Sequence, residues 1–230
     1  MSTVTPDNGV AKSIKDQNRW QLWLVIVANV VAFYLLMQWD EISTAGIQTL
    51  MTKAANILPL GLAMVVVTVI NGLLTPAAKA RIVFLRWTHA LPGHRAFTEL
   101  AAADPRVDMG RLEKALGNKL PVNPDEQNSV WYRLYKSIEK HPSVEHVQRD
   151  WLLLRDYACL VVLGTAVFGL AGMIFLNSTK VALLYVGAMI VQFLLVRQAA
   201  ANYAQRFVTT VLAEKAASPL ASKNTRSAKG

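Results

Sequence analysis

Four uncharged apolar runs constrain the fold of this chain more than any other feature of its sequence. None of them contains an acidic residue, a basic residue or a histidine, and they cover residues 22–39, 57–74, 157–176 and 181–196. An α-helix rises about 1.5 Å per residue, so about 18 residues span about 27 Å, close to the roughly 30 Å hydrocarbon core of a bilayer. The runs therefore predict four transmembrane helices.

The composition of the chain agrees with a membrane protein. Hydrophobic residues make up 53% of its 230 residues, and the formal net charge is +9. In a membrane protein, an excess of Lys and Arg is typical of cytoplasmic loops, so nucleic acid is not the default partner. The single cysteine, Cys159, lies inside an apolar run, which excludes a disulfide framework or a zinc site built from the cysteines of this chain.

The distribution of charge predicts the face of the membrane on which each segment lies. Of the 24 Lys and Arg residues, 13 lie in the block 78–155, whereas the connection 40–56 carries one, together with Asp40 and Glu41. The positive-inside tendency places the basic segments in the cytoplasm. We therefore expect an all-α, polytopic protein of the bacterial inner membrane, with both termini cytoplasmic and a helical cytoplasmic domain inserted between transmembrane helices 2 and 3.

This topology divides the chain into six segments. They are a cytoplasmic N-terminal tail (1–19), a first transmembrane hairpin (20–77), the cytoplasmic helical domain (78–155), a second transmembrane hairpin (156–197), a cytoplasmic helix (198–214) and a disordered tail (215–230). The first apolar run is interpreted as a retained anchor, because no small-residue cleavage pattern follows it directly.

Local signals predict two short helices early in the cytoplasmic domain. The mixed basic and apolar segment 79–87 is typical of a helix that leaves the bilayer or lies in its interface, and the sequence Leu91-Pro92-Gly93 is expected to end it. Asp108 is placed to cap a helix over 109–116, which Gly117 is expected to stop.

Longer helices are predicted on the C-terminal side of the domain. The apolar spacing in 126–140 favours one helix, and Pro142 opens another that continues without a turn signal into the third apolar run. After the fourth run, a helical stripe is expected to pack on the central helices or on a neighbouring subunit. This stripe consists of Ala200, Tyr203, Ala204, Phe207, Val208, Val211 and Leu212.

Hydrogen-bonding and small residues within or beside the apolar runs are the candidates for a pore or for helix packing. They are Asn29, Thr68, Asn71, Thr75, Thr165, Gly169 and Gln192. Such residues usually mediate contact between membrane helices, and the alternative is a water-lined pore made by a homo-oligomer. No carboxylate occurs in the runs, which disfavours an ion-coupled transporter.

Five arginines and one tryptophan of the central block are the candidates for contact with a partner or with lipid. They are Arg81, Arg86, Arg95, Arg106, Arg133 and Trp131. Attraction to anionic lipid head groups accounts for such a set without a further partner. A cytosolic protein, a nucleotide or a nucleic acid is the sharper alternative, and it stays open.

The polar residues of the block form no recognisable catalytic motif. Two histidine pairs are each five positions apart and interrupted by proline, so metal-ligand geometry is not expected for His89 with His94 or for His141 with His146. Asp104 and Asp108 are interpreted as helix caps. A Gly-rich phosphate loop and a nucleophile elbow are both missing from the sequence. We therefore expect no catalytic residue, cofactor or metal.

Three strings of the central block carry a resemblance to a group of bacterial proteins. The strings are residues 91–98 (LPGHRAFT), 104–108 (DPRVD) and 127–135 (QNSVWYRLY). They resemble a pattern in small membrane proteins that accompany anti-phage systems, including those of the retron type, as the membrane effector. The resemblance implies a cytosolic nucleoprotein sensor as the partner, and it carries over no functional residue.

Three functions follow from these observations. The first is a membrane-embedded effector of a bacterial defence or stress system, which perturbs the inner membrane when a cytosolic partner activates or releases it. The second is a non-catalytic membrane scaffold that recruits a soluble protein, and the third is an interfacial lipid-modifying enzyme. The lack of a catalytic motif favours the first two over the third.

Overall fold

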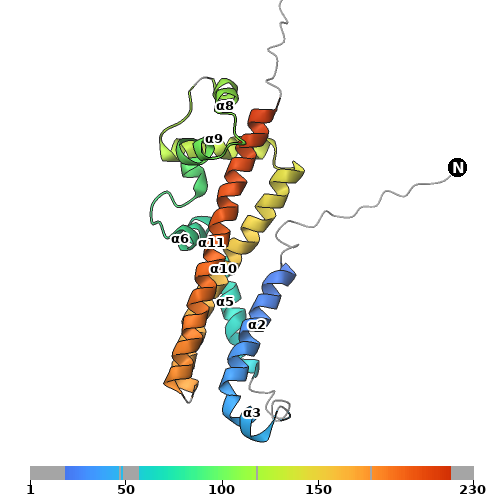
Figure 1. Ribbon diagram of the computed structural model, residues 1–230, viewed down its shortest axis with the longest axis vertical. Helices are drawn as coiled ribbons and strands as arrows, with labels where there is room; N and C mark the ends of the chain where they lie inside the picture. Colours follow the sequence, from blue (N-terminus) through green and yellow to red (C-terminus); the bar gives the residue numbers. More distant parts are fainter. Residues whose placement is uncertain (1–18, 47, 49–56, 118, 177, 219–230) are drawn as a thin grey trace, which may run out of the picture. The chain divides into compact units, whose positions relative to one another are not determined.

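The computed structural model describes residues 19–46, 48, 57–117, 119–176 and 178–218, and in these residues every regular element is a helix (Figure 1). The prediction of an all-α chain is confirmed. The expected N-terminal tail (1–19) and disordered tail (215–230) lie mostly outside the described residues, but α11 continues to Ala217 and so extends beyond the predicted end at residue 214. The elements are α2 (Arg19–Met37), α3 (Trp39–Ala45), α5 (Ile57–Leu73), α6 (Pro76–Phe84), η2 (Pro92–Arg95), η3 (Ala96–Leu100), α7 (Ala101–Ala103), α8 (Met109–Leu116), α9 (Pro124–Ser137), α10 (Pro142–Phe175) and α11 (Thr179–Ala217).

Three helices are long and apolar enough to cross a membrane. They are α2, α10 and α11, with 19, 34 and 39 residues. A fourth span is available if α5 and α6, which are separated by a bent break, are counted as one, because α5 alone has 17 residues. The described residues therefore hold three to four candidate spans, which is compatible with a multi-pass membrane protein.

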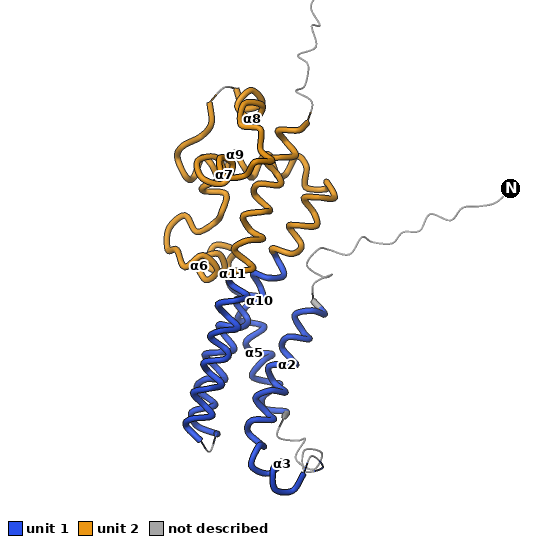
Figure 2. The backbone as a smooth tube through the Cα atoms, in the orientation of Figure 1, with its two compact units in different colours: residues 1–74, 152–197 blue, residues 75–151, 198–230 orange. Residues whose placement is uncertain are grey.

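The chain divides into two compact units (Figure 2). Unit 1 consists of residues 1–74 and 152–197, and unit 2 consists of residues 75–151 and 198–230. Helices α10 and α11 each contribute residues to both units without a break. The single helix expected from Pro142 through the third apolar run is thereby confirmed.

An aromatic cluster forms the centre of unit 1. The ring of Phe33 on α2 lies 5.1 Å from that of Phe168 on α10 and 5.4 Å from that of Tyr185 on α11. Val67 of α5 is fully buried in the same cluster. Gly172 of α10 also adjoins this cluster, since a Cβ atom added there would lie 3.6 Å from the Phe33 ring, an ordinary packing distance.

Large apolar side chains also cover the outside of unit 1. A soluble protein rarely exposes so many of them, whereas the acyl chains of a bilayer are a favourable environment for such a surface. Examples from all the long helices of the unit are Leu24, Leu58, Leu62, Val66, Leu170, Ile174, Leu184 and Leu195.

The C-terminal part of α11 is the central element of unit 2. Five of its side chains have no exposed surface, and they recur every three or four residues: Ala200, Ala204, Val208, Val211 and Leu212. Phe207 packs on the rings of Trp131 and Tyr135 from α9, each at 5.3 Å between ring centroids. The predicted stripe therefore packs on the central helices of the same chain.

Helix α8 forms as its flanking residues predict. The Asp108 carboxylate accepts a hydrogen bond from the Arg111 amide at 2.9 Å, and Gly117 ends the helix with a φ of +89°. The side chain of Asn123 caps α9 in the same way, with Pro124 at its first position, so α9 begins two residues before the expected start.

The segment around α6 differs from its prediction. The helix ends at Phe84, because Leu85 adopts the left-handed conformation with a φ of +50°. Pro92 opens the next helical segment, η2, instead of ending the preceding one, since proline is well suited to a first helical turn, where its missing N–H costs least.

Gln127 is a buried polar residue that the sequence analysis did not single out. Its side-chain oxygen accepts hydrogen bonds from the amides of Phe97 and Thr98 at 3.0 and 3.2 Å, and its Nε2 donates to the Val122 carbonyl at 2.8 Å. It is 1% exposed. The residue thus satisfies backbone groups of the η3 segment that α9 covers.

Replacing Gln127 by alanine is expected to destabilise unit 2. The amides of Phe97 and Thr98 would lose their acceptor inside the protein, which costs about 2 kcal/mol. Unfolding of the purified full chain in detergent, followed by tryptophan fluorescence, measures the loss. The matched control is Gln198→Ala, since this exposed amide donates only to Asn202, and its effect is expected to stay within about 0.5 kcal/mol. Equal losses in both variants would contradict the role given to Gln127.

Candidate functional site

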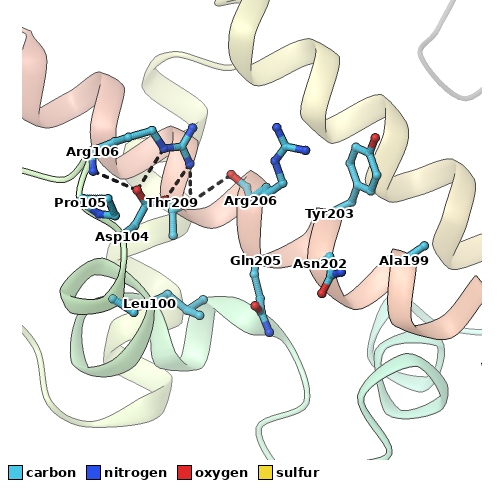
Figure 3. Close-up of a pocket in the computed structure, with 11 residues that line it drawn as sticks. Leu100, Asp104, Pro105, Arg106, Ala199, Asn202, Tyr203, Gln205, Arg206 and Thr209 are labelled. Atoms are coloured by element: carbon cyan, nitrogen blue, oxygen red, sulfur yellow. Dashed lines mark hydrogen bonds and ion pairs between the residues drawn. The ribbon is translucent and has the colours of Figure 1, made fainter. Parts of the chain in front are cut away.

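Unit 2 carries a pocket between α11 and the turn that follows α7 (Figure 3). Its volume is about 760 Å³, which is within the range of small-molecule sites. The lining combines polar and apolar side chains from two stretches of chain: Leu100, Ala103, Asp104, Pro105 and Arg106 from the first, and Ala199, Asn202, Tyr203, Gln205, Arg206 and Thr209 from α11.

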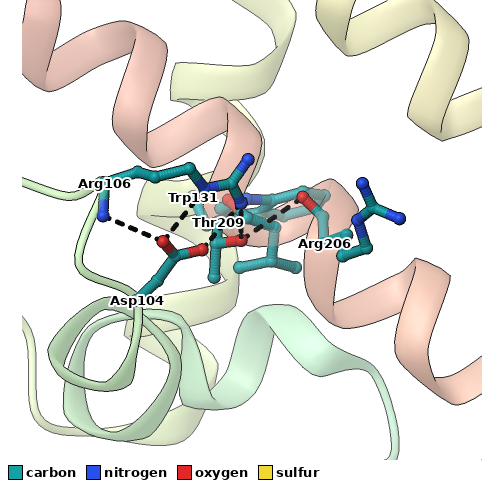
Figure 4. A network of polar contacts seen from close by, with 6 residues as sticks. Asp104, Arg106, Trp131, Arg206 and Thr209 are labelled. Carbon is teal, nitrogen blue, oxygen red and sulfur yellow. Dashed lines mark hydrogen bonds and ion pairs between the residues drawn. The ribbon is translucent and has the colours of Figure 1, made fainter.

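A polar network holds one wall of this pocket on α11 (Figure 4). The Arg106 guanidinium donates to both oxygens of the Asp104 carboxylate, at 3.0 Å from Nε and 2.7 Å from Nη2. The same Nη2 donates to the Thr209 hydroxyl at 3.0 Å, and the Arg106 amide donates to Asp104 at 3.0 Å. The turn after α7 is therefore fixed to α11 by directional bonds.

The network also fixes the charge of its members. The hydrogen bonds from Arg106 hold the pKa of the Asp104 carboxyl well below its usual range, against the opposing effect of burial. The bond to Asp104 is also the main cause of the raised pKa of Arg106. Asp104 is thus an ionised partner of an arginine. It occupies the C-cap position of α7, where its amide donates to the Ala101 carbonyl. Of the two aspartates, Asp108 is the one whose side chain caps a helix N-terminus.

Trp131 of α9 contacts α11 at Val208, the residue before Thr209. Its indole N–H donates to the Val208 carbonyl at 3.4 Å, and its ring packs on Phe207. The side chain is buried, with 8% of the residue exposed. The role of Trp131 as a contact for a partner or for lipid does not agree with this burial, because internal packing already uses the residue.

The remaining polar groups of the pocket give it a cationic character. The guanidinium of Arg206 lies over the Tyr203 ring, 5.5 Å from its centroid, and the residue is exposed. Asn202 and Gln205 add amide groups to the lining. Guanidinium, amide and phenol groups bind carboxylate and phosphate oxygens well.

Of the arginines that the sequence singles out, Arg106 alone belongs to this lining. Arg81, Arg86 and Arg133 are exposed elsewhere in unit 2. The Arg95 guanidinium lies 5.5 Å from the centroid of the Phe84 ring and makes an ion pair with Glu99 at 3.4 Å. The predicted basic set is thus divided among different environments.

Most of the pore or packing candidates make hydrogen bonds within their own helix. Asn29, Thr68 and Thr165 each donate to the carbonyl four residues earlier, at 2.9, 2.8 and 2.7 Å. The Thr75 hydroxyl accepts from the Ala78 amide as the cap of α6. These bonds leave little polarity directed outward from the helices.

The other candidates lie at contacts between helices of unit 1. Gln192 donates to the Tyr157 hydroxyl at 2.8 Å, which joins α11 to α10. A Cβ atom added at Gly169 would meet Val186 at 3.4 Å. Asn71 is buried, with 6% exposed. Asn29 and Gln192 both line an apolar groove of about 660 Å³ between α2 and α11.

The structure brings one histidine pair closer than the sequence predicts. The rings of His89 and His94 lie 5.0 Å apart, and each is within 3.7 Å of the Asp125 carboxylate. This proximity arises because His89 lies in a turn with a φ of +47° instead of in a helix. Throughout the described ranges, no group of three or more His, Cys, Asp or Glu side chains is arranged to hold a metal ion.

Arg206 and Thr209 are the site residues that sequence reasoning missed. Thr209 is 5% exposed and lies between Val208 and Val211, both of which are fully buried. A hydroxyl on the buried face of a helix requires a polar partner. The position of Thr209 among the apolar stripe residues was therefore the signal in the sequence that could have identified it. Arg206 gave no such signal, because an arginine on the exposed face of a helix is common.

Comparison of the chain with protein-family models, with curated protein sequences and with solved structures gives no significant match.

Replacing Asp104 by asparagine is expected to weaken unit 2 in a pH-dependent manner. A carboxyl group with a lowered pKa in the folded state contributes stability above its unfolded pKa, and loses it as pH falls toward the folded value. The difference in unfolding free energy between the parent and Asp104→Asn is expected to be about 1 kcal/mol at neutral pH, allowing for the half-exposed guanidinium of Arg106. It should shrink below about pH 4.

Unfolding at a series of pH values measures this difference. Asp108→Asn is the matched control. The Asp108 carboxylate is exposed, and its ion pair with Arg111 is long, at 3.9 Å, so its charge is expected to contribute little to stability. A difference between parent and Asp104→Asn that stayed constant down to pH values well below 4 would contradict the ionised pair.

Proposed function

We propose that this chain is a membrane-embedded effector of the bacterial inner membrane whose unit 2 is a receptor for a cytosolic partner. Four spans would anchor it, with α5 and its bent continuation supplying the second, and both termini would lie in the cytoplasm. Binding at the pocket around Arg206 and Thr209 would then rearrange the helices of unit 1 and perturb the bilayer. The likeness of three strings to effectors of anti-phage systems agrees with this role.

The observation that carries the proposal is the continuity of α11. One helix of 39 residues supplies both the apolar stretch that follows Thr179 and the wall of the pocket from Ala199 to Thr209. A ligand that shifts the pocket residues acts on a helix that is also a candidate span. A scaffold that only recruits a protein has no need of such a connection.

The polar residues of the candidate spans support a gated function over a permanent pore. Asn29, Thr68 and Thr165 are bonded to their own helices, so one subunit presents no continuous polar lining. An aqueous path requires polar groups or a sufficiently wide opening. Permeation would therefore need several subunits or a rearrangement, as an effector that is silent before activation requires.

Recording the membrane potential of bacterial cells tests the proposed function. The full chain is expected to depolarise cells when it is expressed with its neighbouring genes and their trigger, and not when it is expressed alone. Arg206→Gln should abolish the response, while Arg133→Gln, an exposed arginine on α9 outside the pocket, should retain it. An unchanged potential under every trigger, together with a constant soluble partner in purifications, would instead favour a scaffold.

The proposed topology is tested with reporter fusions. A reporter inserted after Gly117, at the end of α8, is expected to be active only in the cytoplasm, and so is one placed after Ser218. Both would agree with an even number of spans between the two positions. A periplasmic signal from the Gly117 fusion would overturn the topology and the receptor role together.

A further inference from the structure

The loop after α6 exposes two large apolar side chains in a strained backbone. Leu85 is 62% exposed and Trp87 is 84% exposed, the highest value among the exposed large hydrophobic side chains of the described residues. Leu85 and His89 both have a positive φ, +50° and +47°. Non-glycine residues rarely adopt this conformation, and a strained loop that displays apolar groups is a common feature of binding surfaces.

The stretch of chain from α6 to η2, which contains this loop, is basic and has no acidic residue. It carries Lys79, Arg81, Arg86 and Arg95, and the sequence has no Asp or Glu between Glu41 and Glu99. Arg81 and Arg86 are exposed. The exposed part of this segment therefore presents positive charge beside apolar groups.

Arg95 does not belong to the exposed charge of this segment. Its side chain is 12% exposed, and its guanidinium lies over the Phe84 ring. Its Nη1 donates to the Glu99 carboxylate at 3.4 Å, which offsets its charge. The positive charge that the segment exposes therefore comes from Arg81 and Arg86.

We propose that Arg81, Leu85, Arg86 and Trp87 form an interfacial surface that docks on the head groups of anionic phospholipids. The two guanidiniums bind lipid phosphates, and the Trp87 and Leu85 side chains enter the boundary between head groups and acyl chains. Leu85 follows Leu73, the last residue of the apolar helix α5, by only twelve residues, so the chain itself brings the surface to the membrane. The inference rests on the membrane location proposed above.

Anionic lipid is favoured over a protein partner by the combination of groups. An acidic protein would also match the arginines, and tryptophan and arginine are common in protein interfaces. Lipid is favoured because the surface follows α5, which forms part of a candidate span, by only twelve residues. Tryptophan is enriched at the membrane interface, where its ring is half-solvated, and arginine is attracted to the negative inner leaflet. The two features occur together within the seven residues from Arg81, near the end of α6, to Trp87 in the loop that follows it.

A fluorescent probe at residue 88 tests the docking. The full-length Thr88→Cys protein is labelled with an environment-sensitive dye, since Thr88 is exposed and the native Cys159 is fully buried. The protein is placed in nanodiscs of phosphatidylcholine alone, or of equal parts phosphatidylcholine and phosphatidylglycerol. The expected result is a blue shift, with quenching by shallow-labelled lipids, only when phosphatidylglycerol is present.

Variants distinguish the effect of Arg81 and Arg86 from the effect of lowering the net positive charge of the protein elsewhere. Each Arg→Gln change at 81 or 86 is expected to weaken docking about fivefold, and the double change about 25-fold. Trp87→Ala should reduce shallow quenching while keeping the preference for phosphatidylglycerol. Arg111→Gln is the matched control on α8, which lies at the other end of unit 2 from α6 (Figure 2), and it should leave docking unchanged.

Several outcomes would overturn the proposal. A probe equally water-exposed in both lipid mixtures would do so, as would equal losses in Arg111→Gln and in the loop variants. A blue shift produced by inorganic phosphate in phosphatidylcholine nanodiscs would assign the site to a soluble anion instead. Because a nanodisc offers lipid to both faces of the protein, these results do not depend on the topology or on the depolarising activity.

Discussion

Hydrogen bonding along the helix backbone is the constraint on which the rest of this structure depends. Acyl chains offer no hydrogen bonds, so a span must satisfy its peptide groups internally. A helix that does so can enter a protein core without any change in its backbone. On α11 only the side-chain environment changes, from Leu184 and Leu195, exposed by 65% and 68%, to Val208 and Leu212, which are fully buried. One element therefore serves two units.

Directional polar bonds fix the register of unit 2. Apolar burial is not directional, and the small side chains of Ala200 and Ala204 on α11 tolerate several alignments. Arg106 removes this freedom, because its guanidinium reaches the Thr209 hydroxyl only in one register. Gln127 acts in the same way between α9 and the Phe97 segment. The unit thus combines an adaptable apolar contact with a few bonds that select one arrangement.

The sequence predicts the elements whose signals are local. Asp108 and Gly117 bound α8 because capping depends on a few adjacent residues. The length and continuity of α10 follow from the lack of any breaker after Pro142. The end of α6 could not be predicted in this way. Leu85 adopts a positive φ that a leucine side chain does not favour, so no local signal marks this end of the helix.

The candidate site was less predictable, because it depends on pairs of residues far apart in the chain. Asp104 and Arg106 were identified separately, as a cap and as a contact, whereas their pairing with Thr209 joins positions 103 residues apart. Periodicity places Thr209 on a helix face but does not identify its partner. The histidines show the same limit, since a spacing of five excludes proximity only if both residues lie in one helix.

The arginines of this chain show why a count of charges does not define a surface. Arg106 is neutralised by a bidentate carboxylate, so it contributes structure to unit 2 and little net field. Arg95 lies over Phe84 and pairs with Glu99 at 3.4 Å, so its charge is also offset. The exposed Arg81 and Arg86 adjoin a segment of chain that is free of acids. Because opposite charges within a few ångströms cancel at longer range, Arg81 and Arg86 contribute more to the field of unit 2 than Arg95 or Arg106 do, and the total of +9 does not describe that field.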